Sequence, residues 1–387
     1  MGVLESRRSC LSTHPLTDVV TPESERQKQP DQSPKKGRRM DPRGRYTVER
    51  TEDGVGGTVY TLRDRIAGVC ASAAPGRGFL WSSLCMDCAG MGTVELLYRG
   101  GDFADALTGG GMSPVLFPVV GRLRLGEAQS VYVHEGKRYD MDTHGFAKDM
   151  EWHRVVADAD VDSRGAFVRA YLSDSDETRR AYPFAFEYAL TYRLLEGALH
   201  IEVEVESEGP FSVGFHPYFN TPFAPGMGTK ADCALRLPVR KYWVLENLVP
   251  TGEVRELEEV YDLPEGVCCS QLDLDQVFTD LVTNQRGTHR SSLWDRASGI
   301  RVDVESTLDP FSEIVVYAPR SEAYVCIENW TGPPNILNQE ETWSGLPPSA
   351  LRASIRIKPS RFGVCGARVS GSANGFSRPP PQGTVSR

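Results

Sequence analysis

Residues 186–206 read FEYALTYRLLEGALHIEVEVE, and their side chains alternate between apolar and mainly polar types. Successive side chains of a β-strand point to opposite faces, so a period of two predicts strands with one apolar and one mainly polar face. The alternation is most regular in the second half, where Ile201, Val203 and Val205 are separated by glutamates. Residues 195–198 lie between the two runs, which predicts a β-hairpin.

The same alternation returns at 300–304 and at 351–357, where charged residues separate the apolar ones. The short apolar runs 314–317 and 324–327 are typical of strands that are covered on both faces. No segment has the i, i+3, i+4, i+7 apolar spacing of a helix over three turns. With 37 glycines and 26 prolines available for turns, these patterns predict an all-β protein with one large antiparallel β-sandwich at 45–365.

The two ends of the chain differ from this body in composition. Residues 1–44 and 366–387 are polar, carry an excess of basic over acidic side chains and lack a hydrophobic period, so we expect two disordered tails. No stretch approaches the roughly 18 consecutive apolar residues of a membrane-spanning helix. The first thirty residues also lack the apolar block of a secretion signal. We therefore expect a soluble, cytoplasmic protein without a membrane partner.

Charge is distributed unevenly along the chain, which has 43 Lys and Arg and 52 Asp and Glu residues. Residues 46–365 hold 30 of the basic and 46 of the acidic side chains, a net charge of −16. Such a body repels the phosphates of a polynucleotide, so no nucleic-acid partner is expected. The basic run at 35–39 is interpreted as part of a solvated tail. The oligomeric state does not follow from the sequence.

The nine cysteines are an odd number scattered over a long chain, which does not indicate a secreted disulfide framework. Free thiols in a reducing cytosol are the simpler interpretation. Cys85 and Cys88 form a C-x-x-C motif, which is typical of a redox pair or of half a zinc site. No second motif follows at a usable spacing, so we interpret this spacing as coincidence and expect no metal.

Two of the seven histidines have unusual neighbours in the sequence. His144 lies in DTHGFAKD (142–149) and His216 lies in GFHPYFN (214–220). Sugar sites combine aromatic rings, which cover C–H faces, with polar groups that bond to hydroxyls, and both segments have this mixture. Either histidine is also consistent with a hydrogen-bonded residue at the end of a strand.

Glu328 lies in VCIENWTGPPN (325–335), after an apolar run and before a turn. A strand there would carry the carboxylate to a rim or concave face of the sandwich. Burying a carboxylate beside apolar groups is costly unless something pairs with it or uses it, so Glu328 is a candidate functional residue. The alternative is a structural role, in which Glu328 bonds to backbone amides of the following loop.

The order of four motifs resembles the aldose 1-epimerases, and the likeness is closest to the branch that includes the lactose-operon-associated mutarotase-like proteins. The motifs are PVLFPVVGR (114–122), HGFAKD (144–149), GFHPYFN (214–220) and CIENWTG (326–332). The resemblance covers about 46–362. It implies a galactose mutarotase-like supersandwich, in agreement with the strand pattern.

The resemblance also implies roles for residues. His216 matches the general acid of the family, and Glu328 matches its general base. His144 matches a sugar-binding histidine, and Lys148 stands where the family more often has arginine. Arg122 and Asp275 resemble hydroxyl-binding residues, with Asp273 as a competitor for the role of Asp275. No metal or organic cofactor is implied.

The activity implied is the interconversion of the α and β anomers of a free hexose. C1 of a pyranose cannot invert while both of its oxygens stay bonded, so the ring must open and reclose. The base takes the proton of the O1 hydroxyl while the acid protonates the ring oxygen. This requires an ionised Glu328 and a protonated His216, and we expect the nearby negative charge to favour the imidazolium.

Two alternatives remain at this point. One is an epimerase of a hexose 6-phosphate, with Arg122, Lys148 and Arg124 as the cations that would bind the phosphate. The strongly acidic body disfavours it. The other is a carbohydrate-binding protein on the same fold that has lost catalysis. The presence of both His216 and Glu328 favours an enzyme.

Overall fold

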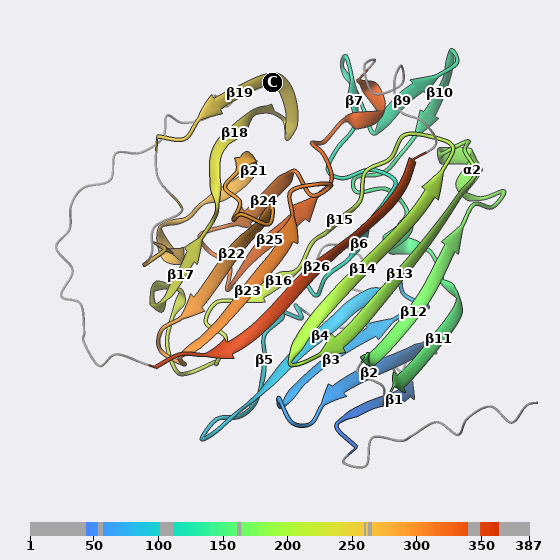
Figure 1. The fold of residues 1–387 in the computed structure, drawn as a ribbon. Helices are drawn as coiled ribbons and strands as arrows, with labels where there is room; N and C mark the ends of the chain where they lie inside the picture. The colour runs from blue at the N-terminus through green and yellow to red at the C-terminus, as the bar shows by residue number, and fades with distance from the viewer. Residues whose placement is uncertain are drawn as a thin grey trace, which may run out of the picture. The chain divides into compact units, whose positions relative to one another are not determined.

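The computed structural model describes residues 44–52, 57–100, 111–160, 164–258, 261, 265–339 and 349–363. The tails expected at 1–44 and 366–387 lie outside these residues, apart from Gly44. The described residues are mostly in β-strands, and every pairing between strands is antiparallel (Figure 1). The prediction of an all-β, antiparallel fold is confirmed. None of the helices in the described part is long and apolar enough to span a membrane.

The strands form three large sheets (Figure 1). The five-stranded sheet contains, in order, β1 (Tyr46–Glu52), β2 (Thr58–Asp64), β3 (Val69–Ala74), β4 (Leu80–Cys88) and β5 (Gly92–Glu95). The nine-stranded sheet contains β11 (His153–Asp160), β12 (Gly165–Ser173), β13 (Phe186–Leu195), β14 (Ala198–Ser207), β26 (Ser349–Arg361), β23 (Ile300–Thr307), β22 (Thr288–Asp295), β17 (Cys233–Arg236) and β20 (Val267–Cys268).

The eight-stranded sheet carries the residues of greatest interest. It contains β19 (Val249–Glu256), β18 (Val239–Glu246), β21 (Leu274–Leu281), β24 (Glu313–Ala318), β25 (Tyr324–Trp330), β15 (Gly214–Phe215) and β6 (Val115–Leu116), with β16 (Tyr218–Asn220) also paired to β25.

The remaining elements are short. Two ribbons pair β7 (Arg124–Leu125) with β8 (Ala128–Gln129), and β9 (Val131–His134) with β10 (Lys137–Asp140). The helical turns are η1 (Ala147–Asp149), α2 (Thr178–Ala181), η2 (Lys230–Asp232), η3 (Cys269–Gln271) and η4 (Ile336–Asn338).

The hairpin predicted from residues 186–206 is formed by β13 and β14. They pair from Phe186↔Ser207 to Leu195↔Ala198, and the turn residues Glu196 and Gly197 have φ of +50° and +69°. Positive φ at both central residues is the signature of the type I′ turn, whose twist matches that of the strands. The short apolar runs also form strands, and all seven residues of β25 are buried.

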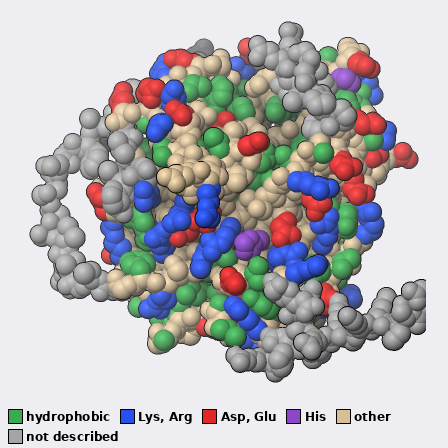
Figure 2. Space-filling model, in the orientation of Figure 1, with side chains coloured by type: hydrophobic (Ala, Val, Ile, Leu, Met, Phe, Trp, Pro, Cys, Tyr) green, Lys and Arg blue, Asp and Glu red, His purple; other side chains and the backbone are tan. Residues whose placement is uncertain are grey.

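The alternation along β13 did not predict how far its mainly polar face is buried. In β13 the outward-facing Ala189 and Thr191 are buried, with 4% and 1% exposure. Long charged side chains lie across the outer face of the sheet and cover them: the Arg169 guanidinium donates to Thr191 Oγ1 at 3.2 Å and to Glu204 at 2.6 Å. Figure 2 shows side chains of both charges interspersed over β14 and β26.

One hydrophobic cluster joins the sheets of the described body. It takes Leu62 and Leu84 from the five-stranded sheet, Leu190 and Val203 from the nine-stranded sheet, and Ile327 from the eight-stranded sheet. This shared core fixes the sheets against one another and leaves the opposite face of the eight-stranded sheet available for other side chains.

Candidate active site

Strand β25 brings Glu328 to the face of the eight-stranded sheet that points away from the main core. Val325 and Ile327 belong to the main hydrophobic cluster. Because side chains alternate along a strand, Cys326, Glu328 and Trp330 lie on the opposite face. Cys326 and Trp330 accordingly belong to separate, smaller clusters on that face. Glu328 lies between them and is only 1% exposed.

The pairing of the neighbouring strands places His216 opposite Glu328. Strands β15 and β16 both pair with β25, in the register Gly214↔Trp330 and Tyr218↔Cys326. The position halfway between these pairs sets His216 against Glu328, and His216 Nε2 lies 3.3 Å from Glu328 Oε1. Pro217 has no N–H to continue the ladder, which is consistent with the interruption between β15 and β16.

Three contacts hold the His216–Glu328 pair in position. The indole Nε1–H of Trp330 donates to Glu328 Oε2 at 3.2 Å, so each carboxylate oxygen has a partner. The ring of Tyr218 stacks on the imidazole of His216 with centroids 4.6 Å apart and an angle of 9° between the planes. The backbone N–H of His216 donates to Pro114 O at 3.3 Å. The two groups are therefore fixed within proton-transfer distance.

Burial determines where the proton of this pair resides. It lowers the pKa of His216 to about 4. It also raises the pKa of Glu328 well above its usual value, and the negative charge of Asp275 acts in the same direction. The expectation that neighbouring carboxylates would favour the imidazolium is therefore wrong, because desolvation of both charged forms outweighs their attraction. Both shifts act in the direction that favours a neutral imidazole and a protonated carboxyl.

His144 is held in an unusual backbone conformation by the loop that follows β6. It has a φ of +68°. The backbone N–H of His144 donates to Gly121 O at 2.9 Å, and the Gly121 N–H donates to His144 Nδ1 at 3.0 Å. The next residue, Gly145, has a φ of +70°, and a Cβ there would lie 2.2 Å from Phe117 O. Only glycine fits this position without displacing the backbone.

These contacts define the tautomer of His144. Since Nδ1 accepts a hydrogen bond, the neutral ring carries its proton on Nε2 and can donate it. Burial lowers the pKa of His144 well below its usual value, with further contributions from His216, Lys148 and Arg122. The ring lies edge-on to His216, with centroids 5.5 Å apart. His144 is thus a neutral hydrogen-bond donor beside the acid/base pair.

Asp275 and Arg122 lie at the solvent-facing side of the same group. Asp275 is on β21, in a row of paired residues that continues through Tyr317 to Cys326. Its carboxylate is exposed, yet surrounding protein raises its pKa while Arg122 lowers it. The competitor Asp273 precedes β21 and accepts from the backbone N–H of Arg320 at 3.3 Å. The structure therefore associates Asp275 with the site.

The other nominated cations differ in their surroundings. Lys148 forms an ion pair with its neighbour Asp149 and is near enough to His144 to affect its pKa. Arg124 pairs with Glu246 at 2.8 Å. Of the three candidate phosphate ligands, two already have carboxylate partners. The structure thus gathers His144, His216 and Glu328 at the centre, with the charged residues around them.

Sequence reasoning missed several residues that support this group. Trp330 and Tyr218 fix the pair, and Cys326 lies beside it. The period of two along residues 324–330 was the available signal, since it places Cys326, Glu328 and Trp330 on one face. His216, Cys326 and Glu328 each offer a ligand atom within 4.8 Å of the others, and they are the only such group among the residues described. If a metal ion binds in this part of the chain, these donors suit zinc.

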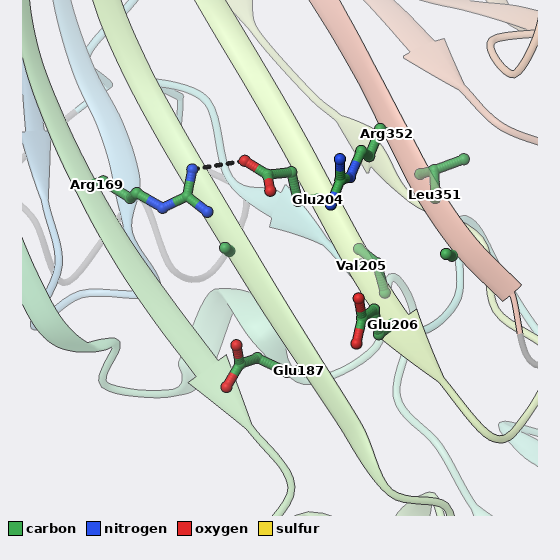
Figure 3. Close-up of a pocket in the computed structure, with 9 residues that line it drawn as sticks. Arg169, Glu187, Glu204, Val205, Glu206, Leu351 and Arg352 are labelled. Atoms are coloured by element: carbon green, nitrogen blue, oxygen red, sulfur yellow. Dashed lines mark hydrogen bonds and ion pairs between the residues drawn. The ribbon is translucent and has the colours of Figure 1, made fainter.

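Two pockets lie away from this group. One is a recess of about 90 Å³ on the outer face of the nine-stranded sheet (Figure 3). Arg169 forms an ion pair with Glu204 in this recess, and two further glutamates, Glu187 and Glu206, also line it. Ligand sites usually measure roughly 300–1,000 Å³, so it is too small for a sugar site. The other, of about 480 Å³, lies between the start of β2 and residues 75–77 and 151–155. Neither contains a candidate site residue.

Comparison with known families and proteins supports a sugar-related function. The family described as aldose 1-epimerase matches residues 89–353. Protein LacX (chromosomal) from Lactococcus lactis subsp. lactis is 24% identical over 234 residues, which are 57% of this chain and 74% of LacX. A plasmid-encoded LacX from the same organism matches to the same extent.

Solved structures show the same fold. A galactose mutarotase-like protein from Clostridium acetobutylicum superimposes with a TM-score of 0.68 at 21% identity, covering 82% of this chain and 99% of that one. The Slr1438 protein from Synechocystis sp. PCC 6803 superimposes with a TM-score of 0.62 at 27% identity, covering 79% of this chain and 96% of that one. Galactose 1-epimerase from Lactobacillus acidophilus NCFM superimposes with a TM-score of 0.61 at 16% identity, covering 82% of this chain and 98% of that one.

Proposed function

Because the chain belongs to the aldose 1-epimerase family, we propose that it interconverts the α and β anomers of a free hexose by opening and reclosing the pyranose ring. The observation that carries this proposal is the contact between His216 and Glu328. An imidazole and a carboxylate from distant parts of the chain lie 3.3 Å apart in a fixed geometry. Ring opening needs one proton acceptor and one donor at the two oxygens bonded to C1.

In the proposed reaction, Glu328 takes the proton of the O1 hydroxyl while His216 gives a proton to the ring oxygen. The C1–O5 bond breaks and O1 becomes the aldehyde oxygen. Rotation about C1–C2 then presents the other face of the aldehyde to O5. Reclosure returns one proton from O5 to His216 and another from Glu328 to O1, so the enzyme is unchanged. Each positioned proton-transfer group typically contributes on the order of 10²- to 10⁴-fold in rate.

The buried environment favours the intermediate of this reaction. Opening starts with an imidazolium and a carboxylate, and it ends with neutral His216 and protonated Glu328. Desolvation disfavours both charges, so it favours the opened state relative to the charged starting state, but it also makes that starting state less populated. The charged starting state has the same total number of protons as the neutral pair. It is reached by moving one proton from Glu328 to His216.

The surrounding residues are suited to holding hydroxyl groups. We assign the Nε2–H of His144 as a donor to a sugar oxygen near C1. Asp275 and Arg122 are exposed and of opposite charge, so they can accept from and donate to hydroxyls further along the ring. Lys148 adds a positive charge beside His144.

A phosphorylated sugar is less well matched by these residues. Phosphate sites combine several cations that are free to form charge-assisted hydrogen bonds. Here Arg124 is paired with Glu246, Lys148 is paired with Asp149, and Arg122 is balanced by Asp275. We therefore propose the free hexose as substrate.

The test is magnetisation-exchange NMR between the α and β anomers of a panel of free hexoses and their 6-phosphates. We expect wild-type protein to accelerate exchange of at least one free hexose more than that of its 6-phosphate. His216→Ala and Glu328→Gln should each lose 100-fold or more, while the exposed His153→Ala and Glu206→Gln should match wild type.

Three results would contradict the proposal. If both site variants keep normal exchange, the assignment of acid and base is wrong. If wild-type protein binds a sugar without accelerating exchange, it is a carbohydrate-binding protein on this fold. Faster exchange of 6-phosphates would identify the phosphorylated sugar as the substrate.

A further inference from the structure

The C-x-x-C motif does not bring its two cysteines together. Cys85 and Cys88 both lie on β4, and residues three apart on a strand point to opposite faces. Cys88 is buried in the main core with 4% exposure. Cys85 is half-buried on the other face of the five-stranded sheet. Cys85 therefore has a different nearest thiol.

That thiol belongs to Cys70 on β3. Cys70 and Cys85 are directly paired in the antiparallel register. Two positions away in the same register, Gly68 lies opposite Asp87, and the Asp87 N–H donates to Gly68 O at 2.7 Å. Gly68 and Asp87 are therefore a pair of the hydrogen-bonded type. The two pair types alternate, so the Cys70–Cys85 pair is of the same type, with Cα atoms typically about 5.5 Å apart. Disulfides span Cα separations of roughly 4.4–6.8 Å.

Two charged residues extend this pair into a row across four strands. Arg63 on β2 is paired with Cys70, and Glu95 on β5 is paired with Cys85. The side chain of Arg63 is 43% exposed. The Cys85 thiol donates to Glu95 Oε2 at 3.4 Å. The order across the sheet is thus cation, thiol, thiol, carboxylate.

We propose that Cys70 and Cys85 form a peroxide-sensitive dithiol that closes reversibly to a cross-strand disulfide, with Cys70 as the attacking thiol and Cys85 as the resolving one. Both side chains are half-buried, so a small oxidant can reach them. This site is separate from the residues assigned to sugar chemistry and does not depend on that assignment.

The electrostatics support this division of roles. The neighbouring Cys85 thiol lowers the pKa of Cys70, and the positive charge of Arg63 acts in the same direction. The pKa of Cys85 is raised by the adjacent Cys70 thiol, by burial and by the charge of Glu95. Since the thiolate is the nucleophile, Cys70 reacts first.

The reaction balances with hydrogen peroxide as oxidant. The Cys70 thiolate attacks one peroxide oxygen and the O–O bond breaks. The departing hydroxide takes up a proton and leaves as water, and Cys70 becomes a sulfenic acid. Cys85 then passes its proton to Glu95 and attacks the Cys70 sulfur. The S–O bond breaks, and the second hydroxide leaves as water with the proton from Glu95. The two sulfurs lose two electrons, which reduce one peroxide to two waters.

The disulfide is expected to be easily reduced. Cβ atoms of paired residues lie roughly 4.5–5.5 Å apart, and hydrogen-bonded pairs lie at the upper end of this range. A relaxed disulfide needs about 3.5–4.5 Å. The closed form is therefore strained, and strained disulfides are more oxidising and more labile.

The test uses the full chain treated with a small molar excess of hydrogen peroxide. Remaining thiols are alkylated, the protein is digested, and the peptides are analysed by mass spectrometry. We expect a linked pair of peptides containing Cys70 and Cys85, which disappears after treatment with dithiothreitol. Cys85→Ser should stop at a Cys70 sulfenic acid that dimedone traps, and Cys70→Ser should leave Cys85 as a free thiol.

Further variants test the role of the cation and of the motif. Arg63→Gln should slow oxidation of Cys70, because it removes a positive charge that lowers the pKa of that thiol. Arg63→Lys should restore most of the rate. Cys88→Ala should form the same disulfide as wild type. A Cys85–Cys88 link, or peroxide oxidation of Cys70 in wild type without a link to Cys85, would overturn the proposal.

Discussion

Replacing Trp330 with phenylalanine isolates the contribution of one hydrogen bond to the proposed reaction. The indole Nε1–H of Trp330 donates to Glu328 Oε2 at 3.2 Å, and it lowers the pKa of Glu328 against the effect of burial. Phenylalanine keeps an aromatic ring between Gly214 and Gly121 but has no donor. The substitution therefore removes a hydrogen bond that stabilises the ionised form of Glu328 more than its protonated form.

The size of the effect follows from the geometry. Hydrogen bonds to charged groups contribute about 1.5–3 kcal/mol. A length of 3.2 Å lies at the long end of the usual range for N–H···O bonds, so the lower value applies. About 1.4 kcal/mol corresponds to a factor of ten. The ionised form of Glu328, paired with protonated His216, should therefore become roughly tenfold less populated, and anomer exchange should slow by the same factor.

The measurement is the anomer exchange rate at saturating sugar, with Trp243→Phe as the matched control. Trp243 lies on the same sheet and donates its indole N–H to another buried carboxylate, that of Glu313, at 3.1 Å. The control removes the same kind of bond from a carboxylate that is not part of the reacting pair, so it should leave the rate unchanged. An exchange rate for Trp330→Phe within twofold of wild type, or an equal loss in Trp243→Phe, would refute the reasoning.

Three further predictions concern stability. Burial raises the pKa of Glu313 from 4.5 to about 7, so the folded state holds this proton more tightly; the resulting stability is present below pH 4.5 and is lost as the pH rises through 7. Glu313→Gln should therefore be about 3 kcal/mol more stable than wild type at pH 8 and similar to it at pH 4.5, as measured by urea unfolding. Gly145→Ala should lower the free energy of unfolding by about 2 kcal/mol or more, because its Cβ would meet Phe117 O, and thermal denaturation measures the loss. Lys230→Met should also cost about 2 kcal/mol or more, since the Lys230 ammonium donates to three backbone carbonyls within residues 319–324; an unchanged urea midpoint would contradict this.

The sequence was sufficient to predict the local elements of the fold. The hairpin of β13 and β14 follows from alternation over adjacent residues and from a turn that tolerates positive φ. The buried character of β25 follows from an unbroken apolar run. These features depend on neighbours in the chain, so a single sequence contains the information. The burial of Ala189 and Thr191 could not be predicted in this way, because it depends on Arg169 from another strand.

The candidate site was accessible to motif reasoning, but its geometry and protonation were not. That His216 faces Glu328 depends on the register between β25 and two short strands more than a hundred residues earlier. The proton position depends on how completely the surroundings exclude water, and sequence neighbours do not reveal this. The same limit explains Cys85, whose partner Cys70 is set by strand pairing rather than by the C-x-x-C spacing.

The position of β26 in the nine-stranded sheet has a consequence for biosynthesis. This strand lies between β14 and β23, so among the described residues it is β26 that joins the two halves of that sheet by strand pairing (Figure 1). While a ribosome is still translating the preceding residues, β14 and β23 each present an unpaired edge, and such edges attract other chains. We expect nascent chains to depend on chaperones until this strand emerges. A premature stop codon before residue 349 should therefore yield an aggregating product rather than a smaller folded protein.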